Sequence, residues 1–130
     1  PIFGWYLKKI GSISIKRNKI SKENLNFFDD ISKQVHSSDR PLIIFPQGTR
    51  LPPEDRVSFK KGSSRIYEEL KIACQPVAIN SGYTWPKKGL KKVNTVLTIS
   101  ILKSIEPGLK KEIFLRELEN AIYSELNILN

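Results

Sequence analysis

The residues best suited to chemistry are Gln47, Gly48, Thr49 and Arg50, which stand consecutively after a short apolar run. The run is rich in β-branched and aromatic residues, and it predicts a buried strand over residues 41–46 that ends in a tight loop. In the loop, Gly48 permits backbone conformations that other residues resist, Thr49 offers a hydroxyl group, and Arg50 presents a planar fork of donors suited to phosphate or carboxylate. We therefore predict an anion-binding loop, although a merely solvated arginine would give the same short pattern.

The upstream segment supplies a second arginine and the elements that would position both. Residues 12–16 alternate between polar and apolar side chains, as in a half-buried strand, and this strand ends at Arg17. Residues 21–35 carry apolar side chains at spacings of three and four, which predicts an amphipathic helix. A strand, a helix and a second strand in this order form a right-handed unit with parallel strands. Because the carboxyl ends of such strands lie side by side, we expect Arg17 and Arg50 to converge on one phosphate.

The rest of the chain continues to alternate between helix and strand patterns. A helix up to about residue 70 is followed by strands over residues 73–80 and 93–102 and by an amphipathic helix over residues 110–129. The predicted fold class is α/β, with a mostly parallel mixed sheet flanked by helices. The side chains expected to face the core from the last two helices are Ile66, Leu70, Ile113, Leu118, Ile122 and Leu126.

Composition bounds the class of protein. A chain of 130 residues suits one domain, and 39% hydrophobic with 27% charged residues is ordinary for a globular protein. There are 22 lysines and arginines against 13 aspartates and glutamates, which gives a formal net charge of +9. That excess favours an anionic partner such as a phospholipid surface, a phosphorylated substrate or nucleic acid, and charge alone does not choose between them.

Single residues exclude several kinds of site. Cys74 is the only cysteine, so no disulfide forms within the chain, and its place in an apolar strand predicts a buried structural thiol rather than a nucleophile. The only histidine, His36, is predicted to end a surface helix without a catalytic role. No apolar run approaches the length of a membrane-spanning helix, and there is no signal-peptide pattern. Any embedded segment would lie outside these residues, or membrane contact would be peripheral.

Five motifs stand in a characteristic order and at characteristic spacings. They are Pro1-Ile2-Phe3-Gly4-Trp5-Tyr6-Leu7, Gly11-Ser12-Ile13-Ser14-Ile15-Lys16-Arg17, Gln47-Gly48-Thr49-Arg50, Phe59-Lys60-Lys61-Gly62 and Gln75-Pro76-Val77-Ala78-Ile79-Asn80. As a set they resemble the lysophosphatidate acyltransferase family, the glycerolipid acyltransferases that acylate 1-acyl-glycerol-3-phosphate. The resemblance covers nearly the whole chain up to the last helix.

The resemblance implies a reaction, its substrates and a location. The sn-2 hydroxyl of lysophosphatidic acid would attack an acyl thioester, carried by coenzyme A or by acyl-carrier protein, and phosphatidic acid would form. No metal and no cofactor are expected, and nucleic acid is not an expected partner. The protein would work at the cytoplasmic face of the cell membrane, either peripherally or anchored by a part outside these residues.

The resemblance also implies roles for individual residues. Gln47 departs from the family, which usually has Glu at this position, so its amide keeps an acceptor but loses the charge. Residues expected to bind the substrate phosphate are Arg17, Arg50 and Lys60. Residues expected to shape the substrate loop are Gln47, Gly48, Thr49 and Gly62. Residues expected on the acyl-donor side are Pro76 and Val77, although an edge strand that tolerates Pro76 would look alike.

The family's catalytic signature, a His followed five residues later by an Asp, is absent from these residues. Five positions after His36 stands Pro41, and the signature would lie upstream of Pro1. We therefore expect residues 1–130 to be the C-terminal part of a single acyltransferase domain, with no catalytic residue of its own and no activity alone.

Several alternatives stay open at this point. Residues 1–10 would either pack in a core or, as an aromatic and lysine-bearing segment, lie at a membrane interface. The loop from Trp85 to Lys92 would meet headgroups, coenzyme A phosphates or a carrier protein, or bind nothing. The chain as a whole would alternatively be a non-catalytic lipid- or phosphate-binding module. A nucleic-acid-binding domain lacks any recognisable fingerprint here.

Overall fold

The computed structural model describes residues 2–13, 23–52, 54–86, 88–92 and 94–129. The chain divides into two compact units, Pro1–Pro41 and Leu42–Asn130, and each is described by itself. None of the helices in these ranges is long and apolar enough to cross a membrane.

The described residues of the first unit form two helices, α1 (Ile2–Lys9) and α2 (Glu23–His36). Helix α2 confirms the predicted amphipathic helix, because Ile31 is buried and Phe28 and Val35 are half-buried. Helix α1 has no buried residue, so the expectation that residues 1–10 pack in a core is not confirmed. The predicted strand over residues 12–16 lies mostly outside the described residues.

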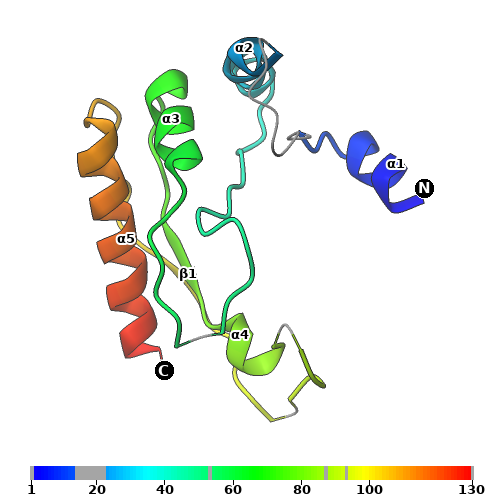
Figure 1. The fold of residues 1–130 in the computed structure, drawn as a ribbon, viewed down its shortest axis with the longest axis vertical. Coiled ribbons are helices and arrows are strands. Elements are labelled where there is room, and N and C mark those ends of the chain that lie inside the picture. The colour runs from blue at the N-terminus through cyan, green and yellow to red at the C-terminus, as the bar shows by residue number, and fades with distance from the viewer. Residues whose placement is uncertain (1, 14–22, 53, 87, 93, 130) are drawn as a thin grey trace. The chain divides into compact units, whose positions relative to one another are not determined.

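In the second unit one helix packs on a small sheet, and a second helix packs against the first (Figure 1). Its elements in chain order are α3 (Lys61–Leu70), β1 (Val77–Ile79), α4 (Ser81–Thr84), β2 (Ile99–Ile101) and α5 (Lys111–Ile128). Helix α5 contacts both α3 and β1, and α3 and α5 lie side by side. The helices predicted near residues 62–70 and 110–129 are confirmed.

The core of this unit lies between α3, α5 and the segments beside them. The rings of Tyr67 and Phe114 stack with their centroids 3.8 Å apart. The Tyr67 hydroxyl donates to the Glu106 carbonyl and accepts the Leu109 N–H at 3.3 Å, so the ring is held at both its face and its tip. The buried residues of the cluster are Phe59, Tyr67, Ile105, Phe114 and Leu118.

The predicted core faces of these two helices are largely confirmed. Ile66, Leu70 and Leu118 are buried, whereas Ile113, Ile122 and Leu126 are half-buried. The face of α5 is centred on Phe114 and Leu118, four residues apart, because these two side chains meet Tyr67 and the rest of the cluster.

The sheet differs from the predicted one. Among the described residues there is one sheet, and β1 and β2 pair in it antiparallel, with Ala78 opposite Ser100. The Asn80 N–H donates to the Thr98 carbonyl at 3.3 Å, and its side-chain oxygen accepts the Thr98 N–H at 2.7 Å. These bonds tie the end of β1 to the start of β2, which requires the strands to run in opposite directions. The mostly parallel sheet is therefore not confirmed.

The predicted strand over residues 41–46 is wrong. The structure assigns no strand there, and the side chains of Ile43 and Phe45 are 76% and 78% exposed. A strand needs a neighbour that supplies its ladder hydrogen bonds, and no described segment pairs with this run. Apolar composition favoured a strand, but pairing decides whether one forms.

Lys71 ends α3 in a left-handed conformation, with φ 53° and ψ 33°. A residue with a Cβ is strained there, whereas glycine is not. We expect Lys71→Gly to raise the free energy of unfolding by about 0.5 to 1 kcal/mol, measured by urea denaturation. Arg65→Gly, in the interior of the same helix, is the matched control and should lower it by about 1 kcal/mol. Equal destabilisation by both changes would contradict this account.

Candidate functional site

A tight turn at residues 45–48 carries the candidate anion loop. The Gly48 N–H donates to the Phe45 carbonyl at 3.0 Å, which closes the turn around Pro46 and Gln47. Gly48 has φ +72°, so its conformation favours glycine as the sequence pattern indicated. The Pro46 carbonyl in turn accepts the Lys60 N–H at 2.8 Å. The turn is therefore joined directly to the residue that precedes α3.

Lys60 lies against this turn with its side chain. A Cβ added at Gly48 would stand 3.3 Å from Lys60 Cγ and 3.8 Å from Lys60 Cε. Lys60 itself has the extended backbone of a residue that precedes a helix, with φ −70° and ψ 134°. The structure thus brings together Gly48 and Lys60, two predicted site residues that are twelve positions apart in sequence.

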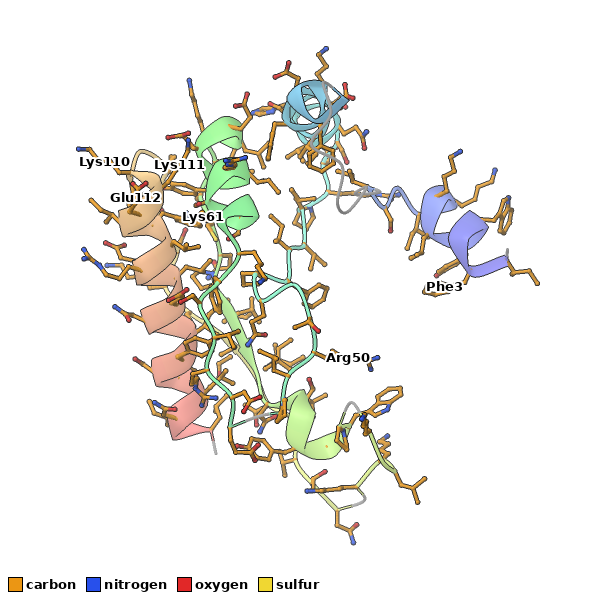
Figure 2. All side chains as sticks on the ribbon, in the orientation of Figure 1. Phe3, Arg50, Lys61, Lys110, Lys111 and Glu112 are labelled. Atoms are coloured by element: carbon orange, nitrogen blue, oxygen red, sulfur yellow. The ribbon has the colours of Figure 1, made fainter. Side chains whose placement is uncertain are left out.

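Arg50 extends into solvent. Its side chain projects away from the loop in Figure 2, and both Thr49 and Arg50 are exposed. Within the part of the chain that the structure describes, Arg50 forms no ion pair or hydrogen bond. Its guanidinium group retains its full set of donors for an external anion. Arg17, its predicted partner, lies outside the described residues, so their convergence stays a prediction.

Gly62 lies in the first turn of α3, and no other residue closes over it. A Cβ at Gly62 would meet nothing within 4 Å. The next two residues are buried serines whose hydroxyl groups donate backward, Ser63 to the Lys60 carbonyl at 2.8 Å and Ser64 to the Lys61 carbonyl at 3.0 Å. These bonds secure the start of α3 beside Lys60.

Helix α5 holds the segment that leads into Lys60. Its residues Glu119, Tyr123 and Asn127 recur every four positions and so share one face of the helix. The Glu119 carboxylate accepts the Phe59 N–H, the Tyr123 hydroxyl donates to the Val57 carbonyl at 2.6 Å, and Asn127 accepts from Arg56 at 2.9 Å. This face of α5 therefore holds Arg56, Val57 and Phe59.

Tyr123 is the centre of this arrangement. Its hydroxyl accepts the Val57 N–H at 3.3 Å and the Gln47 side-chain amide at 3.4 Å, and its ring packs on Phe59 with centroids 5.1 Å apart. The Arg56 guanidinium lies 5.2 Å from the centre of the same ring. Tyr123 therefore connects the turn at residues 45–48 to the segment that leads into Lys60. The sequence analysis missed it, although the polar stripe at spacing four beside the apolar face of α5 was a usable signal.

The two residues predicted on the acyl-donor side differ in exposure. Pro76 is fully buried, and its carbonyl accepts the Leu102 N–H at 3.0 Å. Val77 is partly exposed at the start of β1. Pro76 thus joins β1 to the strand opposite through its carbonyl, a bond that proline can still accept.

His36 ends a surface helix as predicted, whereas Cys74 is half-buried in an isolated bridge with Ile105 rather than buried in a strand. His36 is the last residue of α2, is exposed, and contacts the Ser32 carbonyl through Nδ1 at 2.8 Å. Cys74 packs against the core, and burial raises the pKa of its thiol, which disfavours the thiolate needed for nucleophilic chemistry. Among the residues that the structure describes, no group of His, Cys, Asp or Glu side chains is arranged to hold a metal ion.

A family model described as Acyltransferase matches residues 1–80, which is more than half of the 130-residue chain. The chain belongs to the Acyltransferase family. The matched region of this acyltransferase chain contains the turn at residues 45–48, Arg50, Lys60 and Pro76.

Curated relatives extend the family assignment. The chain is 29% identical over 127 residues to a 1-acyl-sn-glycerol-3-phosphate acyltransferase of Helicobacter pylori, covering 96% of this chain and 53% of that protein. It is 29% identical over 101 residues to the protein of the same name from Pseudomonas aeruginosa, covering 78% and 39%. It is 32% identical over 80 residues to a lyso-ornithine lipid O-acyltransferase of Pseudomonas aeruginosa, covering 62% and 30%. The chain thus spans about half or less of these relatives, and no solved structure matches it.

Gly48 in this acyltransferase chain should not tolerate a side chain. We expect Gly48→Ala to lower the free energy of unfolding by about 1 to 2 kcal/mol, because φ is positive and Lys60 is already in contact range. Gly62→Ala is the matched control, and it should be neutral or stabilising by up to about 1 kcal/mol, since the site is open and helical. Thermal denaturation of both variants measures the difference. Equal effects would show that the turn geometry is not constrained.

Tyr123→Phe should remove the hydrogen bonds that hold the loop but leave no cavity in the core. The ring contact with Phe59 is kept, while the hydroxyl that serves Val57 and Gln47 is lost, so we expect stability to fall by about 1 kcal/mol. Hydrogen exchange at the Val57 amide should accelerate. Ser124→Ala, at the exposed next position, should change stability by less than about 0.5 kcal/mol and leave that amide unaffected. Unchanged exchange at Val57 in Tyr123→Phe would contradict the role of the hydroxyl.

Proposed function

We propose that this chain binds the phosphate of a glycerolipid acceptor within an acyltransferase that acylates the sn-2 hydroxyl of 1-acyl-glycerol-3-phosphate. The product would be phosphatidic acid, an intermediate of phospholipid biosynthesis. The observation that carries the proposal is the turn that brings Gly48 against Lys60 while Arg50 stays exposed, in a chain of the Acyltransferase family. The relatives named as 1-acyl-sn-glycerol-3-phosphate acyltransferases support the choice of acceptor.

The proposed binding step uses two kinds of cation. Arg50 offers a planar, bidentate donor set for phosphate oxygens, and Lys60 supplies a point charge on a flexible stem. Gln47, which also bonds Tyr123, and Thr49 and Gly62 would shape the loop around the phosphate. Arg17 would complete the set. Net charge +9 draws anionic lipid towards the chain before specific contacts form.

The proposed chemical step is nucleophilic attack on a thioester. The acceptor hydroxyl oxygen would form a new ester bond with the acyl carbonyl carbon, and the thiolate of coenzyme A or of acyl-carrier protein would leave. A base would take the hydroxyl proton, and holding the phosphate would fix the hydroxyl at a reactive distance from the thioester. His36 is not followed five positions later by an Asp, so we assign the base to a residue outside residues 1–130. The chain alone is then expected to bind but not to catalyse.

The remaining assignments belong to the same proposal. Pro76 and Val77 would lie on the acyl-donor side, and the acyl thioester is the only co-substrate, with no metal or other cofactor. The protein would act at the cytoplasmic face of a membrane, where its lipid acceptor resides.

The test uses the protein expressed from its complete reading frame. Thioester-dependent acylation of 1-acyl-glycerol-3-phosphate is measured for the wild type and for Arg50→Ala. We expect kcat/KM to fall by about 30-fold, the scale of a lost charge-assisted contact of about 2 kcal/mol. Arg65→Ala, an exposed arginine on α3, is the matched control and should keep wild-type activity.

The acceptor decides whether Arg50 acts on phosphate. With monoacylglycerol, which lacks the phosphate, Arg50→Ala should cost nothing. Activity of Arg50→Ala within threefold of wild type on the phosphorylated acceptor would overturn the assignment. A preference for lyso-ornithine lipid over 1-acyl-glycerol-3-phosphate would replace the acceptor, following the name of another relative. If the wild-type protein binds lipid but transfers no acyl group to any acceptor, a non-catalytic lipid- or phosphate-binding module is favoured.

A further inference from the structure

Helix α1 exposes an unusual amount of apolar surface. None of its residues is buried, and the side chains of Ile2, Phe3, Trp5 and Tyr6 are between 53% and 81% exposed. Figure 2 shows Phe3 on this helix. At about 100° per residue these four side chains fall within an arc of about 160° of the helix. They form one broad apolar face, and a helix with such a face is normally covered on that side by protein or lipid. Water is therefore an unfavourable surrounding for α1.

The charged residues of α1 are both positive. Lys8 and Lys9 lie in its last turn, and no acidic residue precedes Glu23 in the chain. The Arg40 guanidinium donates to the Ile10 carbonyl at 3.2 Å, which places a third cation at the end of the helix. An anionic partner is favoured by this charge, and a second copy of the same cationic helix is disfavoured.

The side-chain types fit a lipid interface. Trp and Tyr combine an apolar ring with a polar tip, and lysines can keep the charged head at the headgroups while the stem lies along apolar surface. Lys9 already lies over the Trp5 ring, with Nζ 5.8 Å from its centre, so cation and aromatic ring occupy one face together. Aromatic and aliphatic side chains with lysines beside them are typical of helices that lie in the plane of a membrane surface.

We propose that α1 docks this protein on the surface of an anionic phospholipid bilayer. The helix lies in the plane of the interface, with Phe3, Trp5 and Tyr6 in the boundary between headgroups and acyl chains. Lys8, Lys9 and Arg40 meet the lipid phosphates. This inference rests on the proposed function and deepens it by naming the surface on which the lipid acceptor is met. Its test needs no acyl transfer, so failure of one proposal can be distinguished from failure of the other.

The first experiment measures the surroundings of Trp5 directly. The chain has two tryptophans, so Trp85→Phe leaves Trp5 as the only indole fluorophore. Phosphatidylcholine vesicles that contain phosphatidylglycerol should shift Trp5 emission to the blue, and brominated acyl chains should quench it. Phosphatidylcholine alone should bind at least tenfold more weakly, because juxtamembrane cations contribute strongly only at anionic surfaces. No blue shift on the anionic vesicles would overturn the proposal.

Charge reversal tests which cations bind the anionic surface. Lys8→Glu with Lys9→Glu should weaken binding to the anionic vesicles at least tenfold. Lys103→Glu with Lys110→Glu changes the net charge by the same amount at exposed positions of the second unit and should weaken binding less than threefold. Equal losses would mean diffuse attraction of a basic protein and would overturn α1 as the docking element. Circular dichroism checks that each variant keeps its helix content.

A crosslinking experiment in the protein from the complete reading frame distinguishes lipid from protein as the cover of α1. A photoreactive amino acid replaces Phe3 and, as the matched control, the exposed Ile128 on helix α5. Irradiation on anionic vesicles should yield lipid adducts from position 3 in clear excess over position 128. Adducts to protein alone from position 3 would overturn the proposal, because α1 would then be covered by another segment or subunit.

Discussion

The second unit depends on the contact between helix α5 and the segment that runs beside it towards α3. Glu119, Tyr123 and Asn127 satisfy backbone and side-chain groups of that segment at three successive turns. The Phe59 ring then enters the core beneath Tyr123. Because Lys60 follows Phe59, its position is set by this contact rather than by its own side chain.

Hydrogen bonds hold one side of the candidate site, and the other side is open to solvent. On the held side, backbone hydrogen bonds connect Pro46 to Lys60, and Tyr123 connects Gln47 to Val57. On the open side, Arg50 reaches into solvent. In the proposed binding of phosphate, a loop held in this way would lose less entropy, while one long side chain would adapt to the ligand.

Three of the exposed apolar surfaces each have their own physical reason. The residues around Ile43 and Phe45 have no strand to pair with among those described. The sheet buries Ala78 on the side of α5, so alternation leaves β-branched neighbours such as Val77 and Ile101 on the opposite, exposed side. Helix α1 differs from both, because its apolar side chains are accompanied by cations, and this combination suits lipid.

The sequence by itself determined helices α2, α3 and α5, most of their buried faces, and the tight turn at Gly48. Spacings of three and four predicted α2, α3 and α5, and Gly48 in a turn followed from residue type alone, because both are local properties of the chain. Tertiary structure decided the rest. Residues 41–46 are not a strand and the one described sheet is antiparallel, since strand pairing depends on partners distant in sequence. Tyr123 meets Gln47 and Val57 only after α5 packs, and no local pattern specifies which distant backbone groups a helix face will bind.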